Sequence, residues 1–168
     1  MKIAAVSDTH GNVANFRKAM DWINKEGISV VLHCGDIGSL ESLKESLAGF
    51  GVKFFGVLGN MDKDFSAYGG PAEGWKTKQY NIKEKVLDVE FDGKKIAITH
   101  FPDAAKKLAQ SGKFDLVFYG HTHRPWDEKV GGCRMINPGE LAGQFYKPSF
   151  AVYDTSNGNL ELKILEKL

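Results

Sequence analysis

The amino-acid sequence predicts an α/β fold, specifically a four-layer α/β/β/α sandwich in which helices flank two mixed β-sheets. Two observations carry this prediction. Strand-like and helix-like patterns alternate through the first sixty residues, as they do in parallel β-α-β units. Two hairpin patterns follow in the second half, and hairpins pair their strands antiparallel. Because one chain carries both kinds of pairing, we expect two packed sheets.

The first half is predicted to form three strands with a helix after each of the first two. The helices show apolar residues at every third or fourth position. The first is expected to begin after the N-cap Asn12 and to end at Gly27, and the second to begin after Ser39 and to end near Gly49. The three apolar strand patterns cover residues 3–6, 30–32 and 54–58.

The second half is predicted to be richer in antiparallel pairs. An Asp92-Gly93 turn separates one pair of strand patterns and an Asn157-Gly158 turn separates another. A third helix near residues 103–110 and a strand at 116–119 are expected between the hairpins. The predicted hairpin strands cover residues 86–91, 95–99, 149–154 and 160–165.

Length and composition narrow the class of protein. The chain has 168 residues, 42% of them hydrophobic, so we expect one domain covering residues 1–168. The net charge is +1 with both signs interspersed, which argues against an extended nucleic-acid groove. Two cysteines without a CxxC pair argue against a disulfide scaffold or thiolate zinc site. No run reaches the ~20 apolar residues of a membrane helix, so we expect a cytoplasmic protein.

Asp, Asn and His residues, which are types that bind metal ions, follow five of the predicted strands. Ligands in α/β folds bind beyond the carboxyl ends of strands, so these side chains can converge on one point. One ion would leave several of them unused, so the sequence predicts two divalent ions. Four imidazoles favour Mn, Ni, Fe, Co or Zn over Mg and Ca, with Mn or Ni preferred. The predicted ligands are Asp8, His10, Asp36, Asn60, His100, His121 and His123.

Asp36 is the natural carboxylate to bridge the two ions. Gly35 precedes it and lets the backbone pass close to them. We expect one carboxylate oxygen to face each ion, because a bridge holds two cations within about 4 Å of each other.

Five sequence blocks resemble those of the calcineurin-like metallophosphoesterase superfamily, in particular its small single-domain phosphodiesterase branch. The blocks are Asp-Thr-His at 8–10, Gly-Asp at 35–36, Gly-Asn-Met-Asp at 59–62, a lone His100 and Gly-His-Thr-His at 120–123. Their order along nearly the whole chain makes the resemblance specific. It implies the same sandwich fold.

The resemblance also implies how the ligands are shared, and it places Asn60 and His100 among the catalytic residues. One metal ion is expected to bind Asp8, His10, Asp36 and His123. The other is expected to bind Asp36, Asn60, His100 and His121.

Two positions depart from the family pattern. Many members carry a His after the Gly-Asn pair, but this chain has Met61, which cannot transfer a proton. Asp62 is either a weak catalytic candidate, through a water or a ligand His, or a cap of the next turn. Phe101-Pro102 stands where relatives commonly have Gly, and an aromatic ring there is expected to narrow the pocket.

Other residues have a structural and a functional interpretation. Arg124 is expected either to reach a substrate phosphate or to be steered outward by Pro125. His33 is expected to be a core histidine rather than a ligand. Cys34 and Cys133 are expected to be buried, and residues 137–139 to form a turn.

The segment at residues 64–85 is rich in aromatic residues and glycine. It is expected to be a surface loop anchored by its aromatic side chains, in preference to a lid over the site or a subunit contact.

We therefore expect an enzyme that uses two metal ions and a bridging hydroxide to hydrolyse a small phosphodiester or nucleotide-like substrate. Aryl esters should react much faster than alkyl esters, because Met61 cannot protonate a poor leaving group. Two alternatives stay open, a phosphomonoesterase and a metal-binding scaffold of the same fold that acts by protein–protein contacts. The sequence leaves the natural substrate, the native metal and homo-oligomer formation open.

Overall fold

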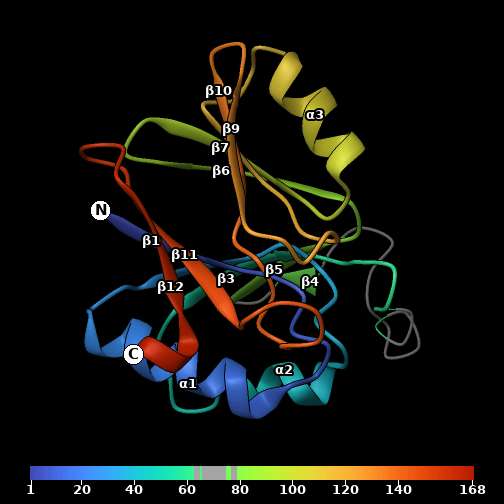
Figure 1. Cartoon of the computed structure of the whole chain (residues 1–168), viewed down its shortest axis with the longest axis vertical. Helices are drawn as coiled ribbons and strands as arrows, with labels where there is room; N and C mark the ends of the chain where they lie inside the picture. Colours follow the sequence, from blue (N-terminus) through green and yellow to red (C-terminus); the bar gives the residue numbers. More distant parts are fainter. Residues whose placement is uncertain (63–64, 66–74, 77–78) are drawn as a thin grey trace.

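The computed structural model describes residues 1–62, 65, 75–76 and 79–168. These residues form two mixed β-sheets that pack against each other, with two α-helices outside one sheet and a third α-helix outside the other (Figure 1). This arrangement confirms the predicted four-layer α/β/β/α sandwich. Most of the segment predicted as a surface loop at 64–85 lies outside the described residues.

The first sheet contains the N-terminal β-α-β units. Its strand order is β12-β11-β1-β2-β3-β5-β4, and β1, β2 and β3 run parallel as predicted. The strands are β1 (Lys2–Val6), β2 (Val30–His33), β3 (Lys53–Val57), β4 (Trp75–Lys76), β5 (Tyr80–Lys83), β11 (Ser149–Asp154) and β12 (Leu160–Ile164). Strands β4 and β5 were not predicted. Leu165 was predicted to end β12, but it begins a 3-10 turn.

Two helices cover the outer face of this sheet. They are α1 (Val13–Lys25) and α2 (Leu40–Leu47). The Asn12 side chain accepts a hydrogen bond from the Asn15 amide at the start of α1, and Ser39 forms a capping box with Ser42 at the start of α2. Both predicted N-caps are therefore confirmed, and each satisfies amide groups that a helix leaves without partners.

The second sheet is built from hairpins joined through one central strand. Its order is β6-β7-β8-β10-β9, and β8 pairs parallel with both neighbours. The strands are β6 (Val86–Phe91), β7 (Lys94–Thr99), β8 (Leu116–Phe118), β9 (Trp126–Val130) and β10 (Cys133–Asn137). The β9–β10 hairpin was not predicted. Four of the five β9 residues are exposed, so this edge strand lacks the apolar alternation that marks a strand.

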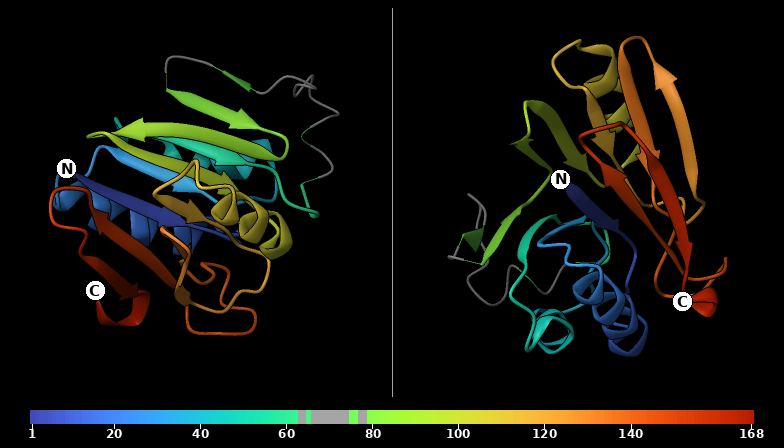
Figure 2. Two further views of the ribbon diagram at one scale, coloured as in Figure 1. Left: turned by 90° about the horizontal axis from the view of Figure 1, so that it is seen from above. Right: turned by 90° about the vertical axis from the view of Figure 1, so that its left-hand side faces the viewer.

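Within the described part of the chain, three clusters of buried apolar residues hold the layers together. Phe16 and Met20 of α1 pack onto the first sheet, and Leu32 and Phe118 meet between the two sheets. Ala105 of α3 (Pro102–Gln110) packs onto the second sheet. Figure 2 shows α1 and α2 side by side on one flank, with α3 beyond the second sheet. None of the described helices is long and apolar enough to cross a membrane.

His33 is confirmed as a core histidine. Its ring is fully buried at the end of β2. Its Nδ1 accepts a hydrogen bond from the Gly35 amide at 3.1 Å, so its Nε2–H donates to the Thr9 hydroxyl, 3.0 Å away. Burial, with the nearby His100 and His10 adding to it, lowers the His33 pKa to about 3. The imidazole therefore stays neutral in the folded protein.

We expect the His33 imidazole not to titrate in the folded protein between about pH 8 and about pH 5. The unfolded chain binds a proton near pH 6.5 that the folded chain, with a pKa of about 3, does not bind. The free energy of unfolding therefore decreases as the pH falls below about 6.5, by about 1.4 kcal/mol per pH unit from this group. Imidazole NMR titration, with the signals assigned through a His33→Gln variant, checks this. A His33 midpoint near its ordinary pKa would contradict it.

Candidate metal centre

The predicted ligands sit where the chain leaves the strands in an unusual backbone conformation. Among the described residues, six that are not glycine have a positive φ. Five of them are predicted ligands, and the sixth, Asp92, lies in the β6–β7 turn. The five ligands are Asp8 (50°), His10 (44°), Asp36 (54°), His121 (69°) and His123 (60°). Such conformations cost free energy and gather at functional sites. Here they turn the chain so that polar side chains converge.

The first cluster contains Asp8, His10 and His123. Nε2 of His10 lies 3.3 Å from Nε2 of His123, and the two rings are stacked. Nε2 of His123 lies 3.5 Å from Oδ1 of Asp8. Each of these three side chains offers one donor atom, and the three donor atoms lie close enough to one another to hold one metal ion.

The second cluster surrounds Asp36 and Asn60. Nε2 of His100 lies 3.5 Å from Oδ2 of Asp36. Oδ1 of Asn60 lies 3.1 Å from both Nε2 of His100 and Nδ1 of His121. Asp8, Asp36 and His100 also form a group with metal-binding geometry. The structure thus brings all seven predicted ligands together.

One oxygen of Asp36 joins the two clusters. Its Oδ2 lies 3.5 Å from Nε2 of His100 and 3.7 Å from Nε2 of His10. Its Oδ1 instead accepts a hydrogen bond from the Met61 amide at 2.8 Å. The expectation that one oxygen faces each ion stays a prediction, because an oxygen that accepts one hydrogen bond keeps a second lone pair.

Hydrogen bonds from the surrounding chain fix the tautomers of two imidazoles. Nδ1–H of His100 donates to the Cys34 carbonyl at 2.8 Å, and Nδ1–H of His123 donates to the Glu140 carboxylate at 2.9 Å. In both rings the Nε2 lone pair faces the site. Metal-binding histidines in proteins are oriented in this way.

The electrostatics of the site fit a bound cation. Burial raises the pKa of Asp8 to about 7 and lowers the pKa of His10 and of His100. Burial thus disfavours the charge on each of these groups. Carboxylate oxygens and imidazole lone pairs face one another, and a divalent ion between them would satisfy both. The donor set therefore fits divalent metal ions.

Glycines in the motif blocks give these side chains room. A Cβ at Gly59 would overlap Oδ1 of Asp36, and a Cβ at Gly120 would overlap the Ser7 hydroxyl and lie 2.8 Å from Oδ2 of Asp8. Neither position has space for a side chain. The glycines before Asn60 and His121 are therefore part of the site.

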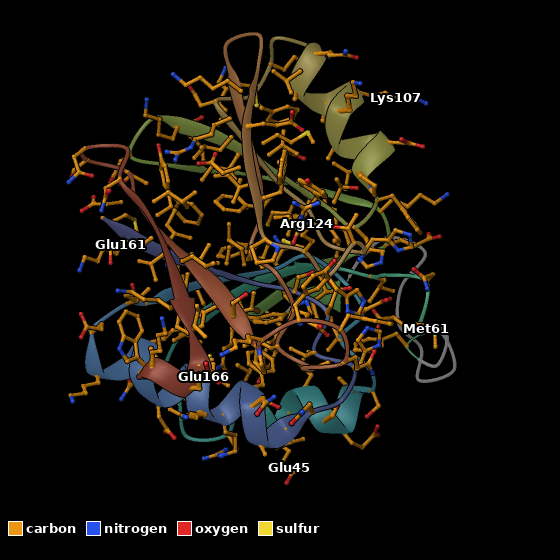
Figure 3. All side chains as sticks on the ribbon, in the orientation of Figure 1. Glu45, Met61, Lys107, Arg124, Glu161 and Glu166 are labelled. Atoms are coloured by element: carbon orange, nitrogen blue, oxygen red, sulfur yellow. The ribbon has the colours of Figure 1, made fainter. Side chains whose placement is uncertain are left out.

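The remaining predicted residues lie around the centre. The Asp62 carboxylate is buried and accepts hydrogen bonds from the Gly38 and Gly59 amides, both at 2.8 Å. Burial raises its pKa to about 6. The side chains of Met61 and Arg124 are exposed, and both are labelled in Figure 3. The Arg124 guanidinium lies 5.1 Å from the centre of the Trp126 ring.

Glu140 is a residue of the site that was not predicted from the sequence. It is fully buried, and besides His123 its carboxylate binds the amides of Gln144 at 2.9 Å and of Phe145 and Tyr146 at 2.6 Å. Burial raises its pKa, but these donors outweigh burial and hold it below the ordinary value. Its position one residue after the predicted 137–139 turn was the only signal.

The predicted turn at 137–139 also supports the site. The Asn137 side chain accepts a hydrogen bond from the Gly139 amide at 2.9 Å, which is the turn expected. Its Nδ2 donates to the Gly120 carbonyl and the Thr122 hydroxyl, both at 3.0 Å. Asn137 therefore holds the loop that carries His121 and His123.

Sequence comparison adds the family to this geometry. Residues 1–158 match the model of the calcineurin-like phosphoesterase superfamily domain. The chain belongs to this superfamily. It is 34% identical over 176 residues to a phosphodiesterase of Methanocaldococcus jannaschii, with 99% of this chain and 100% of the relative covered. The predicted resemblance is confirmed, and the chain is a phosphoesterase, a hydrolase that acts on ester bonds.

Solved structures of other proteins share the fold of this chain. A structure described as a novel archaeal phosphodiesterase superposes with a TM-score of 0.84 at 30% identity, covering 98% of this chain and 99% of that chain. Vacuolar protein sorting 29 from Cryptosporidium parvum superposes with a TM-score of 0.67 at 20% identity, covering 97% and 95%. The second likeness concerns the fold alone.

Proposed function

We propose that the protein is a phosphodiesterase that uses two divalent metal ions. The observation that carries the proposal is the position of Asp36 Oδ2 between Nε2 of His10 and Nε2 of His100. Single-metal hydrolases do not need a carboxylate oxygen between two ligand clusters. The related archaeal phosphodiesterases support the choice of a diester substrate.

The proposed ligand sets follow the two clusters. Asp8, His10, Asp36 and His123 would hold one ion, and Asp36, Asn60, His100 and His121 would hold the other. When bound, two such ions lower the pKa of a bound water toward about 7 and offset the charge of the phosphate. We favour Mn or Ni among the ions that accept several imidazoles.

The chain's own residues set the expected preference for substrates. Asp62 binds backbone amides of two ligand loops, so we assign it to positioning those loops rather than to proton transfer. The Met61 side chain cannot donate a proton. Esters with acidic leaving groups, such as aryl diesters, should therefore react much faster than alkyl diesters.

Hydrolysis assays with restored metals test this function. Chelator-treated protein should regain turnover of an aryl phosphodiester when Mn or Ni is added, with less turnover of the monoester. His121→Ala removes one proposed metal ligand and should therefore lower kcat/KM by about 10³-fold. Each factor of ten corresponds to about 1.36 kcal/mol of lost transition-state stabilisation. Lys107→Ala, an exposed change on α3 (Figure 3), is the control.

Three outcomes would contradict the proposal or part of it. Stoichiometric metal binding without turnover of any ester would favour the scaffold function. Faster turnover of the monoester would favour a phosphomonoesterase. Equal rates for aryl and alkyl diesters would contradict the argument from Met61. The cytoplasmic location and the oligomeric state stay predictions.

A further inference from the structure

A cleft of about 490 Å³ lies beside the metal centre, between the start of α3 and strand β9. Its volume is within the range of small-molecule sites. Two of its lining residues adjoin predicted ligands. Thr122 stands between His121 and His123, and Pro102 follows His100 by two positions. The cleft therefore adjoins the chain segments that carry His100, His121 and His123.

Two exposed aromatic side chains form part of its wall. Trp126 is 46% exposed and Tyr146 is 47% exposed, and both line the cleft. Arg124 also lines it, with its guanidinium 5.1 Å from the Trp126 ring centre. Glu140 binds the Tyr146 amide and so fixes this wall relative to His123. Exposed aromatic faces in a cleft are suited to stacking on a planar ring.

The polar groups of the cleft balance in charge. Asp103 and Glu128 offer carboxylate acceptors, while Lys106 and Arg124 offer cationic donors. The Tyr119 phenol contributes a hydroxyl, and burial and Glu128 raise its pKa, so it stays protonated. A second phosphate would favour an excess of cations. An uncharged heterocycle with both donors and acceptors on its edges matches the groups present.

We propose that this cleft binds the base of a nucleoside carried on the phosphate at the metal centre. The inference rests on the proposed phosphodiesterase function and narrows its substrate to nucleotide esters. Trp126 and Tyr146 stack on the ring, and Asp103 and Glu128 accept hydrogen bonds from its amino groups. Thr122 lies at the junction between the cleft and the metal centre.

Binding measurements without turnover test the proposal. Manganese-loaded protein is titrated with adenosine 5′-monophosphate and with methyl phosphate by calorimetry. We expect the nucleotide to bind at least about tenfold more tightly, and Trp126→Ala to reduce this advantage about tenfold. Trp126→Phe keeps a stacking surface and should retain most of it. Lys18→Ala, an exposed change on α1 away from the cleft, should leave it unchanged.

Equal affinity for the two phosphates in the native protein would overturn the proposal. An undiminished advantage in Trp126→Ala would also overturn it. Either result could accompany full turnover of aryl diesters, and the phosphodiesterase function would then stand. Absence of metal-dependent turnover, with the nucleotide advantage intact, would instead contradict the phosphodiesterase function alone.

Discussion

Asp36→Asn is expected to remove metal binding and to lower diester hydrolysis by on the order of 10³-fold or more, since bound metals contribute several kcal/mol to transition-state stabilisation. The amide oxygen of asparagine can still accept the hydrogen bond from Met61 that Asp36 Oδ1 accepts now. The NH₂ group would then occupy the position of Oδ2, between Nε2 of His10 and Nε2 of His100. An uncharged donor there repels a cation. Metal content by mass spectrometry and kcat/KM for an aryl diester measure the effect.

Asp62→Asn is the matched control. Asp62 is also a buried carboxylate that accepts backbone amides, but its two oxygens bind Gly38 and Gly59 rather than facing the ligands. We expect this variant to lose stability and to keep two ions per chain. Full metal content with turnover as low as in Asp36→Asn would return Asp62 to the catalytic residues. Two ions retained by Asp36→Asn would contradict the bridging role.

Glu140→Ala is expected to give the largest loss of stability. The carboxylate is fully buried and accepts hydrogen bonds from three backbone amides and from Nδ1–H of His123. Removing one partner of a buried charged network typically costs about 3–5 kcal/mol. Loss of the partner that orients a metal-binding histidine typically lowers metal affinity about 10- to 100-fold. Urea unfolding of metal-free protein and calorimetric titration with Mn measure the two effects separately.

Glu140→Gln keeps the size of the side chain and separates charge from packing. Its NH₂ group would face two donors, either Nδ1–H of His123 and the Gln144 amide or the amides of Phe145 and Tyr146. We therefore expect weaker metal binding with a smaller loss of stability than in Glu140→Ala. Glu90→Gln, on the exposed side of β6, should change the unfolding free energy by less than about 0.5 kcal/mol. Native metal affinity in both Glu140 variants would show that His123 needs no carboxylate partner.

The order of the elements could be predicted because local patterns carry it. Asn12 and Ser39 are helix N-caps, and Asp92-Gly93 is a hairpin turn, as their sequences indicate. Strand β9 was missed because an edge strand exposes nearly all of its residues and so shows no alternation. Strand β5 was missed because it is defined by its pairing with β3, and no pattern in its own short sequence indicates that pairing.

The candidate site divides in the same way. The seven ligand positions could be predicted because each follows a strand within a short block of the sequence. Glu140 could not, because its four donors come from His123 and from a loop with no pattern of its own. The cleft likewise joins α3, β9 and Tyr146, which are far apart in the sequence.

The sequence by itself determined the superfamily, the sandwich fold and the identity of the predicted metal ligands. These depend on residue types at short spacing, where the chain's own connectivity limits the arrangement. Only the tertiary structure decided that a single oxygen of Asp36 faces both clusters and that Glu140 fixes the tautomer of His123. Such contacts depend on the packing of loops from different strands to within hydrogen-bond distance, and no local spacing encodes that geometry.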